Sequence, residues 1–232
     1  MGFHYIEGVI LIEQKRWVDK KKKSFEMVSH LVGNLLKKGC VLDERFPPQG
    51  YRSFKDLKSL DPVINAIAFC DPGWLIEFLY KKVGFFFNFE EKRRYSILTL
   101  FSNCSSRSRV DENYLNQILE LCKLVWDSTN GEKIYAMADY EPYVDAFLDG
   151  VGNEEFTIHP SPVWWVEVYG HKLVNKFGKD VLLNIPSYQV EELGDSVLIR
   201  RSKFTSADQK DKNYQLASRG IKYFEEKLKK KK

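Results

Sequence analysis

Two strand-and-helix segments with a similar apolar pattern occur in this chain ninety residues apart. Residues 5–14 and 95–104 are apolar runs of β type, and helical patterns follow them at Phe25 and Leu115. A third pair, with Pro, Trp and Glu in matching places, begins at Asp71 and Ser161. We therefore hypothesise two related β-α-β halves offset by 90 residues. Chance similarity between generic strand–helix patterns is the alternative.

The remaining pattern alternates short strands with amphipathic helices. Ser24 is expected to cap the helix from Phe25, after a loop of four lysines, and Asp111 to cap the next one. That second helix has apolar residues at helical spacing, namely Leu115, Ile118, Leu119, Cys122, Val125 and Trp126. Further strands are predicted at residues 134–137, 163–169, 188–193 and 196–201, and helices at 171–177 and from about Ser206. Gly194-Asp195 is a favoured two-residue hairpin turn between the last two strands.

These elements predict an α+β protein with mixed or antiparallel sheets and packed helices. We expect a single domain over residues 1–232, and the hypothesised repeat would divide it into two interlocked halves at 1–90 and 91–228. Residues 229–232 form a lysine tail. With 44% hydrophobic residues, the chain can bury a substantial core.

The four cysteines, Cys40, Cys70, Cys104 and Cys122, are far apart, which favours buried free thiols over a disulfide framework or a zinc site.

The net charge of +4 conceals an acidic body. Nine lysines lie in two runs, at 20–23 and at 227–232, and without them the charge falls to −5. We interpret the runs as solvated segments, because nucleic-acid binders usually spread basic residues over a folded face. A nucleic-acid-binding module that uses the lysine runs stays open as an alternative. No apolar stretch approaches a membrane span and no signal-peptide pattern is present, so we expect a cytoplasmic protein with no membrane partner.

Motifs for catalysis are missing from the sequence. It contains no GxGxxG, no complete P-loop, no HExxH and no GxSxG. His159, between prolines in His-Pro-Ser-Pro, is the best lone candidate for a general base, but no nucleophile or orienting acid is recognisable beside it. We therefore expect no catalytic residues, no metal site and no cofactor. A hydrolase with a dispersed site around His159 remains an alternative.

The segment from Glu132 to Glu155 combines carboxylates with aromatic side chains. It holds seven acidic residues against Lys133, a local balance of −6. A solvated helix with a packed aromatic side is one interpretation, and an electronegative surface for a basic protein partner is the other. For the second, the predicted contact residues are Asp139, Tyr140, Glu141, Tyr143, Asp145, Asp149, Glu154 and Glu155.

A diffuse pattern within residues 142–199 resembles a known group of proteins. It comprises Pro142-Tyr143-Val144, Leu173-Val174-Asn175-Lys176-Phe177-Gly178, Ile185-Pro186, Val190-Glu191-Glu192-Leu193, Val197-Leu198-Ile199, and the run Ser161-Pro162-Val163-Trp164-Trp165-Val166-Glu167-Val168-Tyr169-Gly170. This pattern is similar to type VI secretion and polymorphic-toxin immunity proteins, namely the group paired with VRR-Nuc nuclease toxins and the related fifty-second immunity family. The N-terminal half fits more loosely, mainly through its strand–helix units and Asp71-Pro72-Gly73-Trp74.

The resemblance implies a non-catalytic antidote. Such a protein binds a cognate toxin and blocks its active site or substrate groove, and the toxin class that the resemblance implies is a VRR-Nuc-type nuclease. The resemblance transfers no contact residues, because these positions vary within the family. It implies no direct contact with nucleic acid.

Overall fold

The computed structural model describes residues 5–13, 20–43, 51–69, 76–91, 95–103, 112–129, 133–138, 165–203 and 209–229. The described strands are β1 (Tyr5–Glu13), β2 (Val41–Leu42), β3 (Glu77–Tyr80), β4 (Val83–Glu91), β5 (Tyr95–Asn103), β6 (Lys133–Ala138), β7 (Val166–Tyr169), β8 (Gln189–Leu193) and β9 (Ser196–Arg200). The helices are α1 (Lys20–Lys37), η1 (Phe54–Asp56, a 3₁₀ turn), α2 (Asp61–Ala68), α3 (Glu112–Thr129), α5 (His171–Phe177), α6 (Lys179–Leu183) and α7 (Lys212–Lys229).

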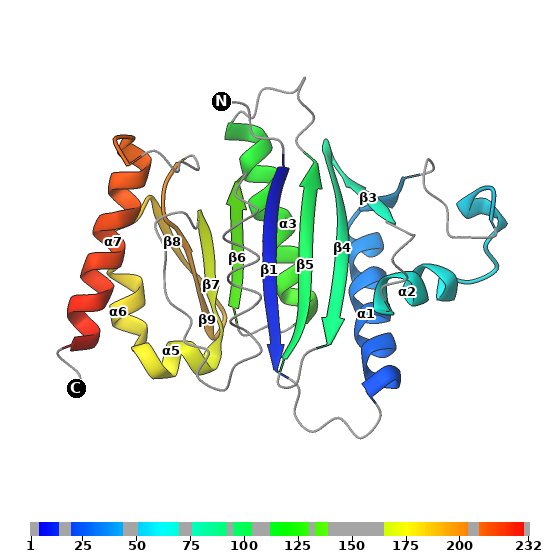
Figure 1. Ribbon diagram of the computed structural model, residues 1–232, viewed down its shortest axis with the longest axis horizontal. Helices are drawn as coiled ribbons and strands as arrows, with labels where there is room; N and C mark the ends of the chain where they lie inside the picture. Colours follow the sequence, from blue (N-terminus) through cyan, green and yellow to red (C-terminus); the bar gives the residue numbers. More distant parts are fainter. Residues whose placement is uncertain are drawn as a thin grey trace.

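The described strands form one nine-stranded sheet, in the order β2-β3-β4-β5-β1-β6-β7-β9-β8 (Figure 1). Every strand pairing in this part of the chain is antiparallel. The predicted α+β class is therefore confirmed, in its antiparallel form. The hairpin at Gly194-Asp195 is also confirmed, and Gly194 has the positive φ of 58° that such a turn requires.

The N-terminal strand lies at the centre of the sheet, between two strands from the middle of the sequence. β1 lies between β5 and β6, which the helix α3 connects. The predicted repeat has matching starts, since β1 and β5 each span nine residues and α1 and α3 each span eighteen. The strands that follow these helices differ: β2 has two residues and pairs with β3 near an edge, whereas β6 has six and lies beside β1. Trp74 and Trp164, whose superposition would test the repeat, lie outside the described residues.

Helices cover opposite faces of the sheet at different places. The larger core joins α1, α2 and α3 to Phe78, Phe85, Phe87, Phe89, Val168 and Leu198. The smaller core joins α5, α6 and α7 to Tyr169, Val197 and Ile199 of β7 and β9. Because side chains alternate along a strand, Val168 and Tyr169 lie on opposite faces, and so do Leu198 and Ile199. Figure 1 shows α5, α6 and α7 gathered near the β7–β9–β8 end.

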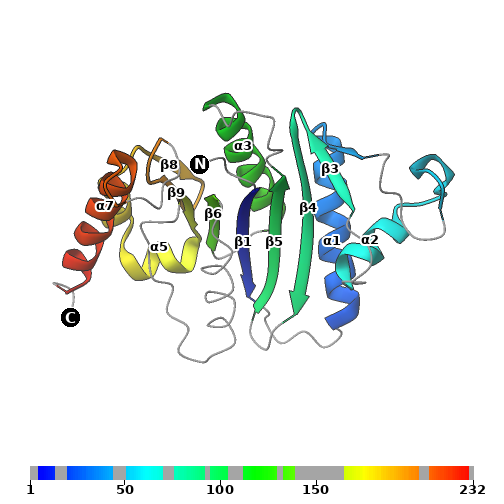
Figure 2. The ribbon, with the colours of Figure 1, turned by 45° about the horizontal axis from the view of Figure 1, so that its top comes forward.

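The sheet curves around α3. Glu120 of α3 binds Lys81, in the turn after β3, with 2.5 Å between the charged atoms. Lys123 of the same helix binds Glu191 of β8 at 2.6 Å. β3 and β8 lie near opposite edges of the sheet, so both flanks must bend toward the helix for one helix to reach both. In Figure 2, α3 lies between the β3–β4 and β8–β9 hairpins.

Two local predictions were wrong, and four elements were missed, namely β2, η1, β4 and α6. The lysines at 20–23 are not a loop but the first turn of α1, and Ser24 is buried within the helix rather than capping it. Lysine is a good helix former, so the run extends the helix. The β3–β4 hairpin turns on two lysines rather than on Asn-Gly, with Lys81 at a φ of 54°, and this hid β4 from the sequence. The short helix α6 was also missed.

Candidate partner-binding surface

The predicted acidic surface falls outside the described residues. This applies to all eight of its residues, Asp139, Tyr140, Glu141, Tyr143, Asp145, Asp149, Glu154 and Glu155, and to His159. The structure does describe residues on either side of it. The chain leaves β6 at Ala138 and is described again from Trp165, and Ala136 pairs with Val166 on the neighbouring strand.

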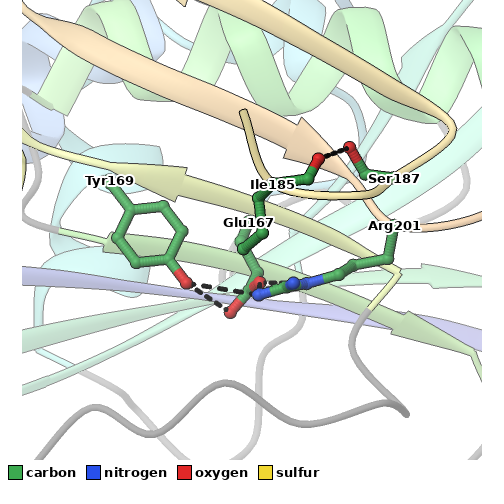
Figure 3. Close-up of polar contacts among 5 residues, drawn as sticks. All are labelled: Glu167, Tyr169, Ile185, Ser187 and Arg201. Atoms are coloured by element: carbon green, nitrogen blue, oxygen red, sulfur yellow. Dashed lines mark hydrogen bonds and ion pairs between the residues drawn. The ribbon is translucent and has the colours of Figure 1, made fainter. Parts of the chain in front are cut away.

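A buried ionic network lies on β7 and directly after β9. Glu167 on β7 and Arg201, directly after β9, form an ion pair in which both side chains are fully buried. Arg201 Nε donates to Glu167 Oε2 at 2.5 Å, and the Tyr169 hydroxyl donates to Glu167 Oε1 at 3.2 Å (Figure 3). The Arg201 Nη2 group also donates to the Tyr169 hydroxyl, at 3.4 Å. Mutual hydrogen bonding offsets part of the cost of burying these charges.

The network perturbs the ionisation of its members. Burial would lower the pKa of the Arg201 guanidinium, but the adjacent Glu167 carboxylate and Tyr169 hydroxyl outweigh it, so this pKa lies above its ordinary value. Burial, and then the Glu167 carboxylate, raise the pKa of the Tyr169 phenol well above its ordinary value. Both groups therefore hold their protons throughout the physiological range, which suits a structural role.

Arg200 lies on the opposite face, between two aromatic rings. Its guanidinium carbon is 5.1 Å from the Trp165 ring centroid and 4.9 Å from that of Tyr188. Its Nη1 group donates to Asn116 Oδ1 of α3 at 3.0 Å, and its Nη2 group to the Lys203 carbonyl at 2.8 Å. The Trp165 indole N–H in turn donates to the Ser202 carbonyl at 2.9 Å. These contacts hold the stack in one conformation.

Tyr188 is the exposed end of this stack. Its side chain is 44% exposed, whereas Arg200 and Trp165 beneath it are buried. Glu112 at the start of α3 accepts a hydrogen bond from the Tyr188 hydroxyl at 3.5 Å and forms an ion pair with Lys203 at 2.8 Å. The hydrogen bond from Lys203 lowers the pKa of Glu112. We call Tyr188, Arg200, Trp165, Glu112 and Lys203 the Tyr188 surface.

Within the described residues, no candidate metal site is found. No group of three or more potential metal ligands occurs among them. The two described histidines, His30 and His171, each form a hydrogen bond with an asparagine four residues further along the same helix. None of the helices in this part of the chain is long and apolar enough to span a lipid bilayer.

Sequence reasoning missed Glu167, Arg200 and Arg201 as a site, although a signal was present. Glu167 stands within an apolar run that is predicted to be a strand, and a carboxylate in a fully buried strand needs a cation nearby. Arg200-Arg201 at the end of another predicted strand supplies it. The pairing of these two strands could not be deduced from the sequence alone.

The fold thus defines an antiparallel α+β protein with helices on both faces of a curved sheet, and it has a counterpart among solved structures. It is similar to Pseudomonas aeruginosa T6SS protein PA0821, with a TM-score of 0.51 and 12% sequence identity. The likeness covers 97% of this chain and 75% of that chain. No protein-family model and no curated protein matches the sequence. At this identity the likeness establishes a shared fold.

Proposed function

We propose that this chain is an immunity protein that binds and neutralises a cognate secreted bacterial toxin. It acts without catalysis, by covering the toxin's active site or substrate groove. The fold likeness to a type VI secretion system protein over nearly the whole chain is the observation that carries this proposal. The sequence resemblance to immunity proteins, noted independently, points the same way. A nuclease of the VRR-Nuc kind is the toxin class which that resemblance implies.

The Tyr188 surface supports a binding role. Tyrosine, tryptophan and arginine are the residues most enriched at the energetic centres of protein interfaces. Here Arg200 is fixed by two hydrogen bonds and two ring contacts, so Tyr188 rests on a rigid support. Less conformational entropy is lost when a partner binds such a preorganised group. Glu112 and Lys203 then form a polar rim.

The proposal predicts that a gene adjacent to this chain's gene encodes a secreted effector with a C-terminal toxin domain, and the test uses that effector. Its C-terminal domain is expressed in a susceptible bacterial host, with and without this chain, and growth and toxin activity are measured. We expect co-expression to restore growth, and the purified proteins to form a complex in which the toxin is inactive. Toxicity that persists despite full expression of this chain, without complex formation, would show that the proposal is wrong.

A pair of tyrosine variants locates the contact. Tyr188→Ala should weaken the complex by about tenfold or more, because hot-spot truncations typically cost about 2 kcal/mol. Tyr51→Ala is the matched control: Tyr51 is 37% exposed and lies between β2 and η1, toward the other edge of the sheet. Equal affinities for the two variants would exclude the Tyr188 surface as the contact.

The predicted acidic surface has its own test. Reversing the charges of Asp139, Glu141, Asp145 and Asp149 together should weaken binding to a basic toxin and make it less salt-sensitive than for wild type. If cells remain fully protected by this variant, the acidic segment is not the contact surface.

A further inference from the structure

The helix α7 has one apolar face and one basic face. Ala217, Gly220 and Phe224 are buried, and Phe224 packs in the smaller core with Tyr169 and Phe177. On the other side, exposed residues recur at intervals of three and four. They are Lys212, Gln215, Arg219, Lys222, Glu226 and Lys229, which we call the α7 stripe. Four of the six are cations and one is an anion.

Among the described residues, no ion pair neutralises the charges of the α7 stripe. On α3, by contrast, Glu112, Glu120 and Lys123 each form an ion pair with another element. No ion pair or side-chain hydrogen bond within the described residues involves the four stripe cations, Lys212, Arg219, Lys222 and Lys229.

The spacing of the charged residues within the stripe does not lead to pairing along the helix either. Arg219 and Lys222 are like charges three residues apart, which repel. Glu226 stands four residues after Lys222, at a spacing that suits an ion pair, yet the two are not paired in the structure. Such a row of uncompensated cations favours an anionic partner.

The pattern of the stripe favours a protein over a nucleic acid. Glu226 interrupts the cations between Lys222 and Lys229, and the exposed Glu225 adjoins it. Carboxylates at these places would repel phosphates, whereas a protein can set a cation opposite Glu226. The stripe also offers no aromatic ring for base stacking. The nearest one, Tyr223, is half-buried and has the Lys227 ammonium 5.3 Å from its ring centroid.

We propose that the α7 stripe docks an acidic surface of the toxin. This inference rests on the proposed function and adds to it the chemistry of a second contact. Along the helix, Lys212, Arg219 and Lys222 are basic, Glu226 is acidic and Lys229 is basic, so the complementary surface carries three anionic groups, then one cationic group, then one anionic group. The toxin therefore presents acidic residues on its own surface in addition to any basic substrate groove.

A charge-reversal pair tests the docking. The affinity for the C-terminal domain of the neighbouring effector is measured at several salt concentrations. Arg219→Glu with Lys222→Glu should weaken binding by about tenfold at physiological salt and flatten its salt dependence. Lys55→Glu with Lys58→Glu is the matched control, since these lysines are also exposed, three residues apart and on another part of the surface. The control should bind within about twofold of wild type. Thermal unfolding checks that both variants are folded.

A single substitution, Glu226→Lys, distinguishes a protein partner from a nucleic acid or a membrane, because it is expected to change binding to them in opposite directions. Glu226→Lys should weaken toxin binding, because it places like charges face to face, and it should strengthen any retention on a short DNA duplex or on phosphatidylserine vesicles. Toxin binding that is unchanged in Glu226→Lys and in the charge-reversal pair overturns the docking inference while leaving the immunity function intact. The docking inference is also overturned if Arg219→Glu with Lys222→Glu loses only its retention on DNA or vesicles and keeps its toxin binding. If wild type itself neither binds nor protects, the proposed function fails first.

Discussion

Arg200 and Arg201 are neighbours in sequence, yet their side chains enter opposite faces of the sheet. Arg200 lies between Trp165 and Tyr188 and bonds to α3, whereas Arg201 pairs with Glu167 beneath α7. The extended backbone at the end of β9 requires this alternation. One dipeptide therefore supports both the exposed Tyr188 surface and the buried junction on which α7 rests.

The buried pair predicts a large and non-additive mutational effect. Arg201→Met should destabilise the protein by about 3–5 kcal/mol, because Glu167 would be left buried and unpaired. Glu167→Leu should cost about as much for the same reason. The double variant should be more stable than either single variant, since neither charge remains. Urea unfolding of the four proteins measures this, and strictly additive losses would show that the two side chains are not coupled.

The exposed ion pair between Lys81 and Glu120 of α3 should contribute much less to stability than the buried pair. Lys81 and Glu120 are about half exposed, so water and salt screen their attraction. The hydrogen bond to Lys81 lowers the pKa of Glu120, but this perturbation belongs to a solvated group. We expect Glu120→Ala to leave the free energy of unfolding within error of wild type at physiological salt. A loss comparable to that of Arg201→Met would contradict this expectation.

The sequence predicted the local elements better than the way they assemble. All six apolar positions predicted on the second helix are buried in α3, because helical periodicity reports directly which face packs. The order of strands depends on pairings between residues far apart in the sequence, such as Val9 with Tyr135, and no local pattern encodes them. The β3–β4 hairpin was missed because its lysine turn lacks the usual Asn or Gly.

The candidate site was less predictable than the fold. Tyr188 was expected at a strand end, but its stacking on Arg200 depends on α3 and β7 meeting at the same place. The acidic segment was visible from composition alone, and its contact role stays a prediction. Helical spacing in the sequence already indicates the α7 stripe, but only the structure shows that its cations form no ion pair with other described residues.

Alkaline pH should destabilise the protein through its buried thiols. Burial raises the pKa of Cys122 to about 12 and that of Cys40 to about 11, from 9.0. Because the folded-state values are the higher ones, the unfolded chain loses these protons first. The contribution of each thiol to the free energy of unfolding is therefore fully present below about pH 9. As the pH rises from there toward the pKa of the folded state, this contribution falls by about 1.4 kcal/mol per pH unit for each thiol.

Urea unfolding between about pH 8 and about pH 11 measures this slope. Tyr169 adds to it in the same direction above pH 10, because its pKa is also raised. Cys122→Ala should remove one thiol's share of the slope and so flatten the curve. Identical slopes for the variant and wild type would show that the Cys122 thiol does not titrate differently in the folded and unfolded states.

The packing of α7 depends on the absence of a side chain at Gly220. A Cβ atom there would lie 2.4 Å from the Pro186 carbonyl oxygen and 3.0 Å from Arg201 Nη1. The nearer atom belongs to the backbone, so a side-chain rotation does not relieve the clash. Gly220→Ala should therefore destabilise the protein by about 1–3 kcal/mol, less the gain in helix propensity.

Gly33→Ala in α1 is the matched control. A Cβ there meets nothing within 4 Å, so this change should stabilise the protein by about 0.5–1 kcal/mol. Urea unfolding compares the two variants, and a Gly220→Ala protein as stable as the control would mean that α7 does not seat against Pro186 and Arg201 as closely as the structure places it.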